Sequence, residues 1–176
     1  MSTSKHLLLG PELIQGDGGS EGKGPLCMEY TVHAVPNTYR DEVKAVFPNA
    51  DLDALKAVIT CQKSQVDLVK QGEQVENEKN ELLERFTFWS RDLCAKLEAK
   101  GYWSDFVDPC SGLAMVHQDS QSVYDEVASL AVLRGFKVSN AGCCKVVLHP
   151  KWGSFIYPAS FFTTAPESEI KKAIDG

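Results

Sequence analysis

The sequence predicts an α+β fold, a mainly antiparallel sheet packed by one long helix. Strand-like and helix-like segments alternate irregularly, the β-like runs near the C-terminus are closely spaced, and one segment, 73–100, is strongly helical. The length of 176 residues suits about one domain, and the apolar fraction of 43% is typical of a globular protein with a core. We therefore expect one α+β domain.

The N-terminal part divides into a polar run and a first strand. Residues 1–25 include the Gly-rich stretch GDGGSEGKGP, which predicts a flexible leader and places the domain at 26–176. The segment 26–35 (LCMEYTVHAV) alternates and is rich in β-forming residues, so it predicts a strand.

A short helix and a second strand follow. Segment 39–47 predicts the helix, with Thr38 as its candidate cap and Pro48 at its end. Segment 55–62 (LKAVITCQ) predicts the strand. The polar segment 64–72 fits either a third strand or a connection.

The strongest element is the predicted helix over 73–100. Its first turns are acidic, its last turn is basic and Gly101 follows it, which agrees with the helix dipole and with C-capping. Apolar residues at helical spacing form one stripe: Val75, Leu82, Phe86, Trp89, Leu93 and Leu97. The stripe predicts a helix packed on the core, with Trp89 as a core residue.

Two further helices are predicted in the C-terminal half. One covers 122–135, capped by Ser122 and ended by Gly135; the other covers 166–174, with Thr164 as the nearest candidate cap. Three β-like runs lie between them: 136–139, 143–149 and 154–164. Their close spacing favours antiparallel pairing.

Charge and hydropathy narrow the function classes. The net charge is −6, the isoelectric point is about 5.2 and arginine is scarce, which disfavours a nucleic-acid partner. No apolar run approaches the ~18 residues of a membrane span, and no secretory or Arg-rich targeting segment is recognisable. We expect a cytoplasmic protein, with a mitochondrial location left open through a longer precursor.

Other candidate chemistry is weak. The six cysteines have no zinc-ligand spacing and are expected to be reduced. Asp105 and Asp108 form a possible carboxylate pair but are interpreted as turn and surface residues. His33, His117 and His149 are interpreted as ordinary hydrogen-bonded or solvated residues.

The adjacent cysteines in SNAGCCKVVLHP are the most informative feature. Side chains alternate across a strand, so Cys143 and Cys144 must point to opposite faces. Lys145 shares the face of Cys143, which predicts an exposed Cys143 and a buried Cys144. Gly142 would permit close approach of another molecule, and Lys145 would favour a thiolate at Cys143. The pattern alone leaves open two tolerated small residues.

Three longer segments resemble one family: GYWSDFVDPCSGL (101–113), GFKVSNAGCCKVVLHPKWG (135–153) and SFFTTAPESEIKKAIDG (160–176). They are similar to the methylmalonic aciduria and homocystinuria type D family, the cobalamin-trafficking cblD family. The likeness spans about 26–176.

The resemblance implies an adaptor rather than an enzyme, with a fold similar to flavin nitroreductases but no flavin or cobalamin bound by itself. It implies a heterodimer with a cobalamin-loaded, cblC-like processing protein, and delivery of cobalamin toward methionine synthase and methylmalonyl-CoA mutase. It assigns the cobalt thiolate to Cys143 and the close approach to Gly142. Lys145 and Trp152 are interface candidates, with core burial as the alternative for Trp152.

Two rival hypotheses stay open at this point. A flavin- or thiol-dependent reductase on the same fold would carry a chromophore or turn over a substrate without a partner. A scaffold with structural cysteines would bind its partner regardless of Cys143.

Overall fold

The main body of the protein is a five-stranded antiparallel sheet. The structure is a computed structural model that describes residues 6–16, 26–142 and 144–176. The sheet has the strand order β1-β2-β3-β7-β4. The strands are β1 (Leu7–Gly16), β2 (Leu26–Ala34), β3 (Lys56–Lys63), β4 (Ser104–Phe106) and β7 (Ile156–Thr163).

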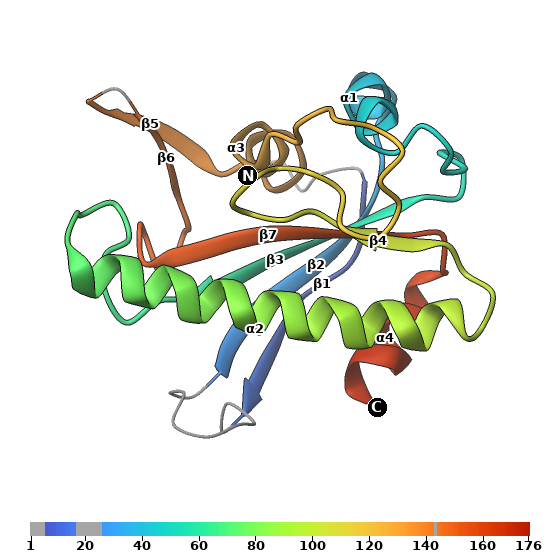
Figure 1. Ribbon diagram of the computed structural model, residues 1–176, viewed down its shortest axis with the longest axis horizontal. Helices are drawn as coiled ribbons and strands as arrows, with labels where there is room; N and C mark the ends of the chain where they lie inside the picture. Colours follow the sequence, from blue (N-terminus) through green and yellow to red (C-terminus); the bar gives the residue numbers. More distant parts are fainter. Residues whose placement is uncertain (1–5, 17–25, 143) are drawn as a thin grey trace.

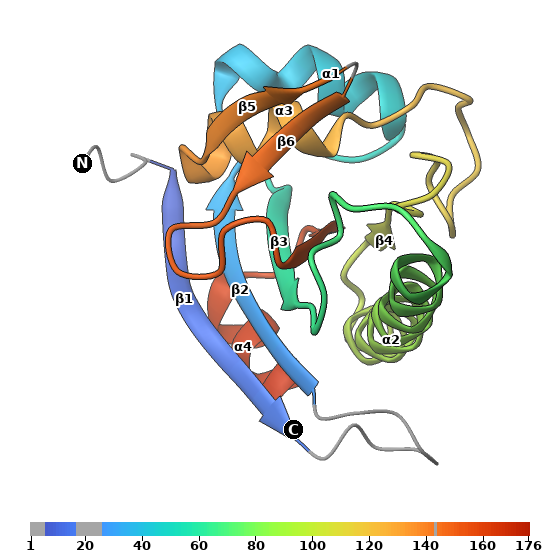
Figure 2. The same cartoon turned by 90° about the vertical axis from the view of Figure 1, so that its left-hand side faces the viewer.

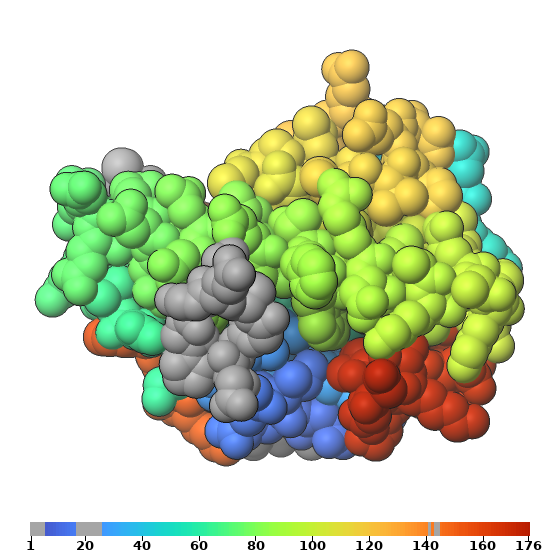
Figure 3. Space-filling model, turned by 60° about the horizontal axis from the view of Figure 1, so that its bottom comes forward, coloured from blue at the N-terminus to red at the C-terminus, as the bar shows by residue number. Residues whose placement is uncertain are grey.

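Helices cover both faces of this sheet. They are α1 (Arg40–Val46), α2 (Glu73–Glu98), α3 (Glu126–Ser129) and α4 (Glu167–Asp175). Figures 1 and 3 show α2 running across one face with α4 beside it, and Figure 1 places α1 and α3 on the other side. The predicted α+β architecture, with a mainly antiparallel sheet and one long helix, is confirmed.

The long helix α2 buries the predicted apolar stripe. Five stripe residues are fully buried and Trp89 is partly buried against the same core. The ring of Phe86 lies 6.0 Å from that of Phe106, and the ring of Trp89 lies 6.2 Å from that of Phe161. Helical periodicity therefore located both the helix and its packing face, because α2 meets the sheet along its length.

The segment predicted as a helix over 122–135 is helical only from Glu126. The Asp125 carboxylate caps it by accepting the N–H of Ala128 at 3.1 Å, so Ser122 is not the cap. The N–H of Tyr124 donates instead to the carbonyl of Gly112 at 2.8 Å, which holds that stretch extended. The last helical turn, Leu130–Arg134, is π-helical and ends at Gly135.

Two other predicted caps are wrong. Thr38 lies within a 3₁₀ turn, Asn37–Tyr39, that precedes α1, and no side chain caps that helix. The Thr164 hydroxyl accepts the N–H of Trp103 at 3.1 Å, while Pro166 stands at the start of α4 without a side-chain cap. Segment 64–72, left open between strand and connection, is a connection.

The predicted flexible leader over 1–25 is wrong for residues 7–16, which form the edge strand β1. This strand pairs antiparallel with β2, and Leu9 and Ile14 pack against the core on the α2 side. Its pairing is interrupted by register shifts around Leu9, which break the regular alternation that a strand prediction needs. Residues 17–25 lie outside the described part of the chain.

Candidate functional site

A separate two-stranded hairpin carries the Gly-Cys-Cys segment. β5 (Lys137–Ala141) pairs antiparallel with β6 (Cys144–Leu148), and Ala141 stands opposite Cys144 in the register. Figures 1 and 2 show this hairpin extending from the body on the side of α3. Residues 137–140 are all exposed, so most of β5 faces solvent. We call β5, β6 and the two residues between them the arm.

Gly142 stands directly after β5, in the turn of the arm. Gly142 has a φ of 65°, in the left-handed region, and is exposed. A Cβ added there would meet no atom within 4 Å, so this side of the turn is open. Cys143 lies outside the described residues, and so does the side chain of Cys144. The roles assigned to the two thiols therefore stay predictions.

The alternation argument that separated the two cysteines is contradicted further along β6. It made the Lys145 face the exposed one, yet Val147 on that face is 8% exposed and Leu148 on the opposite face is 37% exposed. The base of the arm packs on the body through the Val147 face. Lys145 is exposed because it lies nearer the turn, where the arm has left the body.

A buried polar cluster anchors the base of the arm. The Glu29 carboxylate on β2 accepts hydrogen bonds from Arg134 at 2.9 Å and from His149 Nε2 at 3.0 Å. His149 Nδ1 accepts the backbone N–H groups of Lys151 and Trp152, so Nε2 must carry the ring proton and donate. This geometry links the residue after β6 to the body of the sheet.

Electrostatics keep the anchor ionised. Burial by itself raises the pKa of Glu29, but the hydrogen bond from His149 and the charge of Arg134 together hold it below its ordinary value. A nearly buried carboxylate with two hydrogen-bond donors holds those donors, and the chain segments that carry them, in place. The three side chains are far apart in sequence, so no local pattern identified them.

Aromatic contacts complete the anchor. The ring of Trp152 stacks on His149 with centroids 4.5 Å apart, and Phe136 meets the same imidazole edge-on at 5.2 Å. Arg134 lies over the Phe136 ring at 4.6 Å. Trp152 is partly buried against the core, which agrees with the alternative considered for it, while its contact with a partner stays a prediction.

A hollow of about 820 Å³ lies beside the arm. Its walls include Gly142 and Lys145 of the arm, the connection after β3, the first turns of α2 and one end of β7. Gly142 is the residue of the Gly-Cys-Cys segment that lines this hollow in the described structure. We call it the arm hollow.

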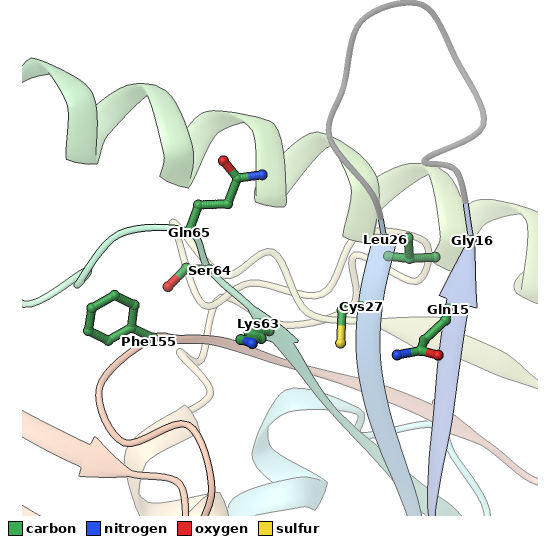
Figure 4. Close-up of a pocket in the computed structure, with 8 residues that line it drawn as sticks. All are labelled: Gln15, Gly16, Leu26, Cys27, Lys63, Ser64, Gln65 and Phe155. Carbon is green, nitrogen blue, oxygen red and sulfur yellow. The ribbon is translucent and has the colours of Figure 1, made fainter.

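A second hollow, of about 940 Å³, lies where β1 and β3 end and β2 begins. Figure 4 shows the Cys27 sulfur and the Gln15 amide on the same side of the β1–β2 pair, with Lys63 of β3 beside them. Cys27 and Gln15 stand opposite each other in the register, which explains their common face. Cys27 is the reactive group among its described lining residues, and a lone thiol does not define a ligand.

Two carboxylates with buried oxygen atoms were not expected from the sequence to be buried. The interpretation of Asp105 as a surface residue is wrong: it is buried, and its carboxylate accepts the N–H groups of Phe106, Val116 and His117. Burial raises the pKa of Asp105, and these hydrogen bonds partly oppose that rise. Because its carboxylate accepts three backbone N–H groups, Asp105 holds the local chain together and has a structural role.

The second carboxylate is Glu126, at the start of α3. The Ser160 hydroxyl donates to one carboxylate oxygen at 2.7 Å, while the other is buried with no hydrogen-bond partner in the described structure. Burial raises the pKa of Glu126 to about 7. Helical patterning cannot reveal such a group, because its partner lies on β7.

Two searches of the described residues bear on function. None of the helices there is long and apolar enough to cross a membrane. Likewise, over the described ranges, no three His, Cys, Asp or Glu side chains gather as a metal site would require.

The sheet, the helix across it and the anchored arm define a class of α+β domain that presents its candidate residues on an exposed hairpin. The chain belongs to the methylmalonic aciduria and homocystinuria type D protein family, whose model matches residues 18–174. The resemblance stated from the sequence is thereby confirmed.

Curated relatives agree with this assignment. The chain is 35% identical over 150 residues to the cobalamin trafficking protein CblD of Homo sapiens, and 33% identical over 150 residues to the proteins of the same name from Gallus gallus and Mus musculus. Each match covers 85% of this chain and 51% of the relative. The chain thus spans about half the length of these relatives.

Proposed function

We propose that this chain is a cobalamin-trafficking adaptor that docks on a cobalamin-loaded, cblC-like partner and supplies the Cys143 thiolate to cobalt. The observation that carries the proposal is the anchored arm, in which the exposed Gly142 directly precedes Cys143 in the chain. The name shared by the curated relatives supports the cobalamin part. The cobalamin is cargo here and comes with the partner.

The chemistry needs a thiolate and an open axial position on cobalt. The Cys143 thiol releases its proton to solvent, and a sulfur lone pair forms the bond to cobalt, whose oxidation state is unchanged. Thiolate is a suitable soft donor for such a metal. The exposed ammonium group of Lys145, two residues further on, would favour the deprotonated form.

Gly142 contributes by what it lacks. Because Gly142 has no side chain and is exposed, its backbone can approach the flat corrin ring of the cargo closely. Lys145 and Trp152 remain our candidates for contact with the partner.

The adaptor role extends to delivery. We place the chain upstream of methionine synthase and methylmalonyl-CoA mutase, as a non-enzymatic protein that binds neither flavin nor cobalamin alone, on a fold similar to flavin nitroreductases. The alternative remains a flavin- or thiol-dependent reductase on that fold.

The test is spectroscopic. Absorption and EPR spectra of cob(II)alamin on the cblC-like partner are recorded before and after adding wild type, Cys143→Ser or Cys144→Ser. We expect wild type and Cys144→Ser to change the cobalt signal and Cys143→Ser to leave it unchanged. Cys110→Ser is the matched control, because Cys110 is an exposed free thiol elsewhere on the molecule.

The other outcomes decide between the hypotheses. If all variants alter the signal alike, or none does while binding persists, the chain is a docking scaffold and the thiolate assignment is wrong. A bound flavin in the isolated protein, or turnover of NAD(P)H without partner, would favour the reductase.

A further inference from the structure

The arm hollow borders the proposed cobalt-binding turn. Gly142 and Lys145 line it from the arm, so a molecule that occupies the hollow meets the residue that precedes Cys143 in the chain. Its other walls come from the connection after β3, from α2, from α3 and from β7, elements far apart in sequence. Figure 1 shows that connection beneath the arm.

Apolar side chains line much of the hollow. Val69, in the connection, is 43% exposed, and Val146 is half-buried on β6. The remaining apolar lining residues are Leu68, Val127, Val147, Ile156 and Pro158. An exposed valine beside a concave apolar surface is the arrangement expected where a partner's apolar side chain is received.

Lysines surround this apolar surface. Lys70, Lys79 and Lys145 line the hollow with one acidic residue, Glu76, which gives three positive charges against one negative and a net charge of +2. Glu76 pairs with Lys79 at 3.7 Å. The whole chain carries −6, so the charge here is opposite to that of the molecule.

The connection is held in place before any partner arrives. Its Val69 N–H donates to the Asp67 carboxylate at 3.1 Å, and its Gln65 N–H donates to Glu78 of α2 at 3.2 Å. A surface that is already ordered loses less conformational entropy on binding. Lys70 and Val69 are therefore presented by a braced loop.

We infer that the arm hollow is the docking face for the cobalamin-loaded partner, and that it receives an acidic segment of that partner with an apolar side chain inserted among Val69 and Val146. This inference rests on the proposed function, which supplies the partner. The apolar surface provides contact area and the lysines provide orientation, since charges at an interface rim act mainly on association rate.

The experiment measures binding of the cobalamin-loaded, cblC-like partner to Lys70→Glu/Lys79→Glu at low and at physiological ionic strength. We expect the association rate to fall about tenfold at low salt, with a smaller difference at higher salt. Lys145 stays unchanged, because it also serves the thiolate in the proposed function. Lys44→Glu/Lys172→Glu is the matched control and should bind as wild type does.

The two control lysines match the two tested lysines in ion pairing and in exposure. Lys172 sits in an i,i+3 pair with Glu169 at 3.6 Å, as Lys79 does with Glu76, and Lys44 is exposed like Lys70. A second variant, Val69→Asp, should raise the dissociation rate about tenfold or more. Val123→Asp is its control, at a valine that is 66% exposed outside the hollow.

The outcomes separate this inference from the proposed function. If the lysine and Val69 variants bind like wild type while wild type still changes the cobalt signal, the docking face is elsewhere and the adaptor role stands. If wild type neither binds nor changes that signal, the proposed function fails and this inference with it. Sedimentation of the chain alone that shows a dimer dependent on Lys70 and Lys79 would identify a second copy as the occupant and overturn the inference.

Discussion

Glu29 is the residue on which the position of the arm depends. Its carboxylate is shared by Arg134 and His149, which reach it from either end of the chain segment that forms the arm. Removing one member of a nearly buried ionic cluster leaves the other charge without compensation. The cluster is thus more costly to break than an exposed ion pair.

Glu29→Gln should lower the free energy of unfolding by about 3 kcal/mol, because the Arg134 guanidinium loses its counter-charge inside the protein. Urea denaturation measures the change. Asp53→Asn is the control. The Asp53 carboxylate is largely exposed and pairs with Arg40 at 2.8 Å, so the loss of this ion pair should lower the free energy of unfolding by under about 1 kcal/mol. Equal losses in both variants would contradict the anchor.

Glu126 makes the free energy of unfolding fall as the pH rises, whereas a carboxylate in an ion pair makes it rise. Its folded pKa, about 7, lies above the ordinary value of 4.5, so the folded chain holds a proton that the unfolded chain has already released between those values. The stabilising contribution is complete below pH 4.5 and is lost as the pH rises to 7. Tyr39, Tyr124 and Asp125 lie around the same carboxyl and carry no positive charge.

Glu126→Gln removes this titration while keeping the shape of the side chain. Between pH 4.5 and pH 7.5, the free energy of unfolding of the variant should gain about 3 kcal/mol relative to wild type. The difference between the two proteins is the quantity to follow. Burial and the nearby charge of Arg134 lower the pKa of His33 to about 4, which gives both proteins the opposite trend over part of this range. A difference that does not change with pH would contradict the raised pKa.

At the scale of the element, the arm is a ribbon with an open turn. The left-handed backbone at Gly142 excludes most side chains for conformational reasons alone, although space is available there. Asparagine tolerates this conformation and is common at such hairpin positions. An asparagine at position 142 therefore preserves the backbone conformation of the turn while adding a side chain that an approaching ligand would meet.

Gly142→Asn should keep the fold yet weaken the cobalt signal at least tenfold, because a side chain now stands where the proposed function brings the corrin ring close. The EPR titration described above measures it, and circular dichroism checks the fold. If the variant gives the full signal, Gly142 serves only the turn.

Elements defined by local periodicity were predictable. The stripe of α2 lies along a single face, so its spacing in the chain reports its packing in space. β2 and β3 are continuous runs of buried, β-forming residues, because helices cover both faces of the sheet. β1 was missed because its pairing with β2 is irregular and a Gly-rich run follows. The start of α3 was misplaced because the carbonyl of Gly112 holds Tyr124 extended.

At the scale of the whole molecule, the sequence predicted the pairing of the arm but not its setting. Closely spaced β-like runs favoured antiparallel pairing, and β5 and β6 do pair in this way, although β6 begins at Cys144 rather than at Cys143. The exposed face of β6 was assigned wrongly, because the packing of Val147 depends on the body beneath it. Glu29 and His149 are 120 residues apart, and only the fold brings them together. Tertiary neighbours, rather than composition, explain these differences.

The arm has a mechanical consequence. The arm is fixed at one end only, where His149 bonds to Glu29. From there it extends along the five residues of β6, about 17 Å at the usual rise per residue. A rotation of about 5° at the base would move the far end by roughly 1.5 Å. Small changes in the packing around Glu29 thus become displacements of about a bond length at the far end of β6, so the stiffness of the base limits how accurately the exposed Gly142 is positioned.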